Sequence, residues 1–141
     1  EAKKYFELII NEFPNTEYAN DSKFKLELII EIMASKEMYL ARYYTQREKW
    51  IPAINRYKKV VSEYDKTIYI EEALHRLVEL HYRIGLIEEA KKYASLLGYN
   101  YQSSQWYESS YRIFDKKYET KSIKRDSKNN TILKKFKKLF K

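Results

Sequence analysis

Two histidines and a glutamate in one short stretch are the residues best suited to chemistry. His75, Glu79 and His81 lie within "HRLVELH", and imidazole and carboxylate groups bind metal ions and transfer protons near neutral pH. If this stretch is helical, six residues turn the chain by roughly 600°, so the two histidines face different directions. His75 and Glu79 share a face, yet two ligands make a poor metal site. We therefore expect no metal and no cofactor here.

Groups for covalent catalysis lack the partners they need. The 141-residue chain has no Cys, which removes thiol nucleophiles, thiolate metal ligands and disulfides. Its serines lie in polar turns without a histidine nearby in the sequence, and a serine nucleophile needs such a base. The stretch "SSQWYESSY" is better explained as a helix cap followed by core aromatic residues. We expect no catalytic residues and a protein that is not an enzyme.

Charge divides the chain into a neutral body and a basic end. Residues 1–111 hold 16 Lys and Arg against 17 Asp and Glu, whereas residues 112–141 hold 12 against 3. A neutral body argues against a nucleic-acid platform. The last segment, "TILKKFKKLFK", carries five Lys, a pattern typical of segments that contact an anionic membrane surface. A partner groove, RNA or simple disorder are the alternatives. The apolar contact residues of this tail are Ile132, Leu133, Phe136, Leu139 and Phe140.

Helices must position these groups, because turn-forming residues are too few for a sheet protein. The chain has two Gly and two Pro, against roughly ten Gly in an average domain of this length. Apolar spacing predicts helices over residues 1–13, 17–47, 52–64, 69–84, 87–97 and 104–117. Thr16 is the expected cap of the second, while Gly85 and Gly98 are expected to end the fourth and fifth. The sequence thus predicts an all-α body over residues 1–118, a flexible polar linker over 119–130 and the basic amphipathic tail over 131–141.

Three similar turns indicate that the helices are organised as repeats. "FPNT", "YDKT" and "YQSS" each join an aromatic residue to two turn-prone positions and a Ser or Thr. In the tetratricopeptide repeat a small residue early in the second helix precedes an aromatic residue by four positions, as at Ala53 and Tyr57. Ala2 and Ala90 occupy the same place in the neighbouring repeats. This pattern predicts helical hairpins stacked in a right-handed superhelix.

The spacing of the small residues predicts one long shared helix. Ala53 and Ala90 are 37 residues apart, close to the usual 34, but Ala2 and Ala53 are 51 apart. No Gly or Pro interrupts residues 17–47, so the extra residues should extend one helix to about 45 Å. That helix would pack first against residues 1–13 and then against 52–64. Because the chain starts with the second half of a repeat, we expect it to be a fragment of a longer protein.

Three segments carry a family resemblance. They are "FPNTEYANDSKFKLELI", "ASKEMYLARYYTQREKWIPAINRYKKVV" and "IEEALHRLVELHYRIGLIEEAKKYASLLGYNY". They resemble the C-terminal half of the BamD family, the tetratricopeptide lipoproteins of the outer-membrane β-barrel assembly machine. The doubled Tyr and the Asn-Arg pair are its most specific part, and the likeness covers about residues 1–107. Asp65 and Gln102 depart from the family, which often has Pro at these repeat ends.

The resemblance implies a non-catalytic scaffold at the periplasmic face of the outer membrane, lipid-anchored through a missing N-terminus. It implies docking on the last POTRA domain of BamA, with Arg47 and Arg56 at positions that face BamA, and contacts with other assembly-machine subunits. Unfolded outer-membrane proteins would be recognised mainly by the missing N-terminal half. Arginine suits bidentate carboxylate pairing, and we expect both arginines to share one surface patch outside the repeat core.

Two other functions are compatible with the residues. One is another tetratricopeptide adaptor, which would bind a peptide partner in its concave groove. The other is an RNA- or DNA-associated protein that acts through the basic tail. We do not expect nucleic acid to be a partner.

Overall fold

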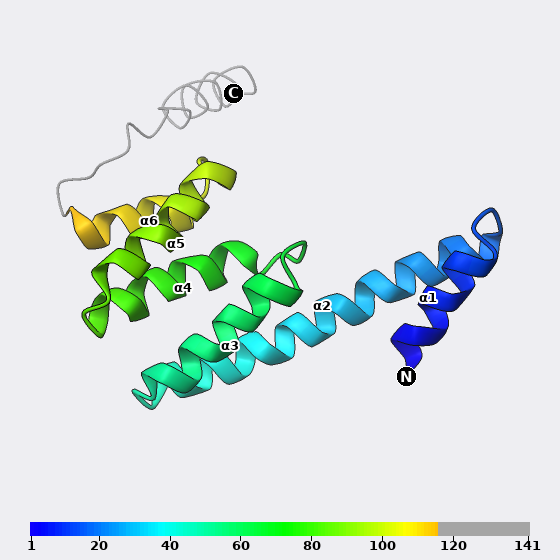
Figure 1. Cartoon of the computed structure of the whole chain (residues 1–141), viewed down its shortest axis with the longest axis horizontal. Coiled ribbons are helices and arrows are strands. Elements are labelled where there is room, and N and C mark those ends of the chain that lie inside the picture. The colour runs from blue at the N-terminus through cyan, green and yellow to red at the C-terminus, as the bar shows by residue number, and fades with distance from the viewer. Residues whose placement is uncertain (116–141) are drawn as a thin grey trace, which may run out of the picture.

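The computed structural model describes residues 1–115, which form six helices joined by short turns (Figure 1). Over this range the chain contains no strand, so the all-α prediction is confirmed. Neighbouring helices pair in chain order, and the last one packs on both the fourth and the fifth. The handedness of the superhelix stays a prediction. The helices are α1 (Ala2–Glu12), α2 (Glu17–Gln46), α3 (Trp50–Glu63), α4 (Ile70–Arg83), α5 (Ile87–Asn100) and α6 (Gln105–Phe114).

The second helix, α2, is uninterrupted over 30 residues, which makes it about 45 Å long. Its first half lies beside α1 and its second half beside α3 (Figure 1). The buried residues of α2 fall into two groups, one in the half beside α1 and one in the half beside α3, with no buried residue from 23 to 33. The prediction of one helix shared by two hairpins is therefore confirmed. The two groups are Ala19 and Ser22, then Ala34, Glu37, Met38 and Ala41.

The main core lies where α2, α3 and α4 meet. Ala41, Ala53, Tyr57 and Leu77 are all fully buried and belong to one cluster. The small side chains let two helices approach closely, while the tyrosine ring fills the space between them. This is the arrangement that the spacing of Ala53 and Tyr57 predicts.

One hydrogen-bond pattern recurs in the turns that end α1, α3 and α5. In each, the backbone N–H of a Ser or Thr donates to the carbonyl oxygen of the aromatic residue three positions earlier. The donor–acceptor distances are 3.2 Å for Thr16 and Phe13, 3.1 Å for Thr67 and Tyr64, and 3.0 Å for Ser104 and Tyr101. The Thr16 side chain also accepts from the Ala19 N–H at 3.2 Å, which confirms it as the N-cap of α2.

The two glycines have different roles. Gly85 has a φ of +87° and ends α4 in the left-handed conformation, as predicted. The prediction that Gly98 ends α5 is wrong, because the helix continues to Asn100. A Cβ atom at Gly98 would lie 2.6 Å from Tyr107 Cε2, so this glycine is there to let α6 approach α5.

Other helix ends differ from prediction by a few residues. Helix α3 begins at Trp50, two residues before Pro52, which its first turn accommodates. Helix α6 ends at Phe114, whereas the sequence predicts an end at Lys117, which lies outside the described residues. The segments 119–130 and 131–141 lie outside them as well.

Candidate functional site

Arg56 is held in place by a buried carboxylate across the α2–α3 hairpin. Its Nη1 donates to Glu37 Oε2 at 3.0 Å, and Lys59 Nζ donates to Glu37 Oε1 at 2.9 Å. Glu37 is only 7 % exposed, whereas the side chain of Arg56 is 39 % exposed. Arg56 therefore joins α3 to α2 through an ion pair, although it is not part of the buried core clusters.

The ionisation of Glu37 follows from these two cations. Burial of the carboxyl group raises its pKa, but the hydrogen bonds from Lys59 and Arg56 act in the opposite direction and leave the pKa of Glu37 below its usual value. The charged form is thus the one that the fold stabilises. Sequence reasoning missed Glu37 and Lys59. The available signal was a glutamate on the face of α2 that also carries Ala34, Met38 and Ala41.

A shallow hollow of about 400 Å³ lies beside Arg56. Tyr44 comes from α2 and the remaining lining residues from the first turns of α3. Ile51 is 59 % exposed, so the hollow offers apolar surface next to two cations. It is lined by Tyr44, Ile51, Pro52, Asn55, Arg56 and Lys59.

Arg47 is the C-cap residue of α2, and it is not one of the residues that line this hollow. Its Cζ is 4.4 Å from the centre of the Tyr43 ring, close enough for a cation–π contact. The ring of Tyr43 meets Tyr44 edge-on at 5.7 Å, and Tyr44 lines the hollow. That the two predicted arginines share one surface patch stays a prediction. Their role in partner binding stays a prediction.

The histidines have structural partners. His75 Nδ1 is 2.8 Å from Ser110 Oγ on α6, and its Nε2 is 3.6 Å from Glu79 Oε1. His81 Nδ1 is 2.7 Å from the Leu77 carbonyl oxygen. His75 and Glu79 therefore share a face and His81 does not, as the helical spacing predicts. No group of three or more possible metal ligands occurs within residues 1–115.

Among residues 1–115, Glu79 is the carboxyl group whose pKa is lowered most. Burial raises its pKa, while contacts with His75 and Arg76 lower it more, so that the pKa of Glu79 falls to about 2. Arg76 Nη1 donates to Glu79 Oε2 at 2.6 Å, and its Cζ is 5.7 Å from the Trp106 ring. This cluster joins α4 to α6 and serves the fold.

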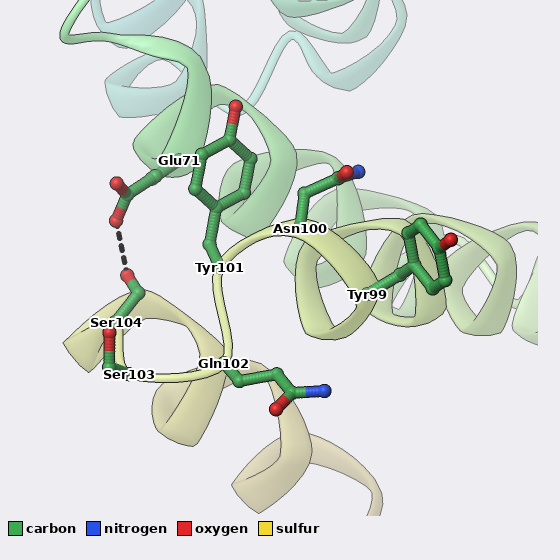
Figure 2. Close-up of a pocket in the computed structure, with 7 residues that line it drawn as sticks. All are labelled: Glu71, Tyr99, Asn100, Tyr101, Gln102, Ser103 and Ser104. Atoms are coloured by element: carbon green, nitrogen blue, oxygen red, sulfur yellow. Dashed lines mark hydrogen bonds between the residues drawn. The ribbon is translucent and has the colours of Figure 1, made fainter.

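A larger, polar hollow of about 750 Å³ lies at the turn between α5 and α6. Figure 2 shows the Ser104 side chain pointing to Glu71, whose carboxylate accepts its hydrogen bond. Tyr99 is 86 % exposed. Because Ser104 also caps α6, its hydrogen bonds hold the turn between α5 and α6 in place. Neither Arg47 nor Arg56 lines this hollow.

The remaining predicted contact residues, Ile132 to Phe140, lie outside the described part of the chain. No helix within residues 1–115 combines the length and hydrophobicity needed to cross a bilayer.

Comparison with known proteins gives a consistent set of relatives. A family model named YfiO and described as an outer membrane lipoprotein matches residues 1–96. The chain is 46% identical over 112 residues to the outer membrane protein assembly factor BamD of Rickettsia prowazekii, a match that covers 79% of this chain and 45% of that relative. Identity to the factor of the same name from Caulobacter vibrioides is 39% over 107 residues, covering 76% and 35%. The chain thus spans less than half the length of these relatives.

Proposed function

The chain belongs to the YfiO family of outer membrane lipoproteins, and on this premise we propose that it is part of a non-catalytic scaffold subunit of the β-barrel assembly machine. The relatives are named as outer membrane protein assembly factors, which supports the process. Stacked helical hairpins present extended surfaces suited to binding other proteins. The proposed location is the periplasmic face of the outer membrane, with a lipid anchor on the N-terminal part of the whole protein.

The proposed partner is the last POTRA domain of BamA, docked on the hollow beside Arg56 and on Arg47 at the C-terminal end of α2. The observation that carries this proposal is the position of Arg56, which Glu37 holds beside an exposed apolar surface. Arginine and tyrosine are enriched among residues that dominate binding energy at interfaces. Here Arg56 is held by Glu37 and Tyr44 by the ring of Tyr43 before a partner binds, which lowers the entropy lost on association.

Calorimetric titration of that POTRA domain into the chain tests the proposal. Arg47→Glu changes an exposed arginine at the C-terminal end of α2, and we expect it to weaken binding at least tenfold. Arg56 requires a paired design, because its removal alone takes one of two cationic donors from the buried carboxylate of Glu37. In a Glu37→Gln background that charge is absent, but the amide oxygen of the glutamine can still accept from Arg56 and hold it in place. Glu37→Gln alone should therefore bind like the wild type, and Glu37→Gln/Arg56→Gln should bind at least tenfold more weakly.

A matched control is a charge reversal on another face. Lys91 lies on α5 with its side chain 56% exposed, and Lys91→Glu should leave the affinity unchanged. Equal affinities for wild type, Arg47→Glu and the double variant, with all proteins folded by circular dichroism, would contradict the proposed docking face.

A second candidate function is peptide binding, and one observation favours it. A hollow of about 270 Å³ lies between the α2–α3 turn and the end of α4, where the Arg83 Cζ is 4.9 Å from the Trp50 ring. If this adaptor role holds, Arg83→Glu should abolish binding of an acidic peptide, while the changes at Arg47 and Arg56 should not affect it.

A further inference from the structure

A second surface of α2, away from the docking hollow, exposes apolar side chains that nothing in residues 1–115 covers. Phe24, Leu28 and Ile32 follow one another at intervals of four residues, which aligns them along one side of the helix. Their exposed fractions are 69, 53 and 60 %. Phe24, Leu28 and Ile30 line a groove of about 400 Å³ together with residues of the turn between α3 and α4. Figure 1 shows this turn alongside the middle of α2.

The groove carries carboxylates at its edge. Glu27 and Glu31 line it together with one cation, Lys66. Glu31 Oε1 accepts from the backbone N–H of Ile68 at 3.3 Å, while its Oε2 is buried without a hydrogen-bond partner among the described residues. A buried carboxylate oxygen is stabilised by a cationic donor. The groove is therefore suited to a segment that brings apolar side chains and ammonium groups together.

We propose that residues 131–141 of the same chain occupy this groove. The segment "TILKKFKKLFK" supplies both properties in eleven residues, because its apolar residues recur at helical spacing and four of its five lysines lie between them. The charge at the groove is complementary to that of the tail: Glu27 and Glu31 line the groove with a single lysine, Lys66, while residues 112–141 have a net charge of +9. Leu133, Phe136 and Phe140 would cover Phe24 and Leu28, and a lysine would supply the missing donor to Glu31.

The intervening chain is long enough for this contact. Helix α6 packs on α4, α4 on α3 and α3 on α2, and packed helices are about 8–10 Å apart, so the stack is about 30 Å across. The 15 residues from 116 to 130 span up to about 50 Å when extended. The groove is thus within reach of a tail that leaves α6 at Asp115.

Paramagnetic broadening in the full chain tests the proposal. Because the protein has no cysteine, Thr131→Cys gives a single attachment point for a spin label beside the apolar residues of the tail. We expect the amide signals of Glu27, Leu28 and Thr67 to lose at least twice as much intensity as those of Lys91 and Ser95 on α5. The difference should shrink at 1 M salt, where the screening length falls to about 3 Å. Phe24→Ser/Leu28→Ser, which alters exposed side chains alone, should abolish the selective broadening.

Three results would overturn the proposal. Equal broadening of the groove and α5 signals would show that the tail has no preferred place on the body. Broadening that appears between an isotope-labelled chain and a separate spin-labelled chain, but not within one chain, would assign the tail to a second copy. Flotation of the chain with phosphatidylglycerol vesicles, lost on replacing the tail lysines with Gln and accompanied by no selective groove broadening, would assign the tail to a lipid surface.

Discussion

Reversal of the charge at Arg56 is expected to destabilise the fold, although this side chain is partly exposed. In Arg56→Glu, the carboxylate of Glu37 loses the donor that lies 3.0 Å away and faces a second carboxylate instead. Glu37 is 7 % exposed, so water cannot replace the lost hydrogen bond. Lys59 still donates at 2.9 Å, which keeps the effect below that of a fully isolated buried charge.

The magnitude follows from the lost bond and from its exposure. A hydrogen bond to a charged group contributes about 1.5–3 kcal/mol, and solvent screening of the Arg56 end places the expected loss near 2 kcal/mol. For a folded unit of this size, such a loss lowers the melting temperature by roughly 6–10 °C. Thermal and urea unfolding of the wild type and the variant, followed by circular dichroism at the helix band, measure both quantities.

Two further variants identify the cause. Glu37→Gln/Arg56→Glu removes the like-charge pair and should recover most of the stability, because the two sites are coupled through one contact. Lys91→Glu, a reversal on the exposed face of α5, should change the free energy of unfolding by less than about 0.5 kcal/mol. The reasoning is refuted if Arg56→Glu is as stable as Lys91→Glu, or if the double variant is no more stable than Arg56→Glu alone.

Three other perturbations test different parts of the fold. Gly98→Ala should lower the free energy of unfolding by about 1–3 kcal/mol through overpacking against Tyr107, although alanine favours a helix; urea unfolding beside the exposed Ser95→Ala control measures it, and a more stable Gly98→Ala would contradict the close approach. Ala53→Trp, at a fully buried position, should cost about 1–3 kcal/mol or more, and an unchanged melting temperature would show that the repeat register is wrong. The pKa of Glu79 is lowered to about 2, so its ionised form stabilises the fold above the unfolded pKa near 4.5, and this stabilisation is lost as the pH falls toward 2; urea titrations across that range should show a shallower pH dependence for Glu79→Gln, and an unchanged dependence would exclude this role.

Much of the fold follows from local sequence patterns, because spacing and turn chemistry act over a few residues. The absence of Gly and Pro from 17–47 predicted α2, and the repeated turn sequences marked the ends of α1, α3 and α5. Gly98 was misassigned because a helix end and a close helix–helix contact both call for glycine, and only the position of Tyr107 on α6 distinguishes them. A contact between helices cannot be obtained from spacing along one of them.

The candidate site was predictable only in part for the same reason. Arg47 and Arg56 were identified through the family resemblance, which names positions but not their neighbours. The bond between Glu37 and Arg56 connects residues 19 positions apart on two helices, and the sequence alone does not show which carboxylate an arginine meets. The position of Glu37 beside Ala34, Met38 and Ala41 on α2 was a signal of burial that the sequence analysis did not use, and it does not identify the partners of the carboxylate.

The unbroken course of α2 has a mechanical consequence for the two hairpins that share it. A continuous hydrogen-bonded helix resists bending, so α1 and α3 cannot turn relative to each other as separate units would. Over a length of about 45 Å, a tilt of about 10° at the α3 end would displace the α1 end by about 8 Å. A partner that binds at the α2–α3 turn would therefore reposition whatever is attached at the α1 end, with α2 acting as a lever arm.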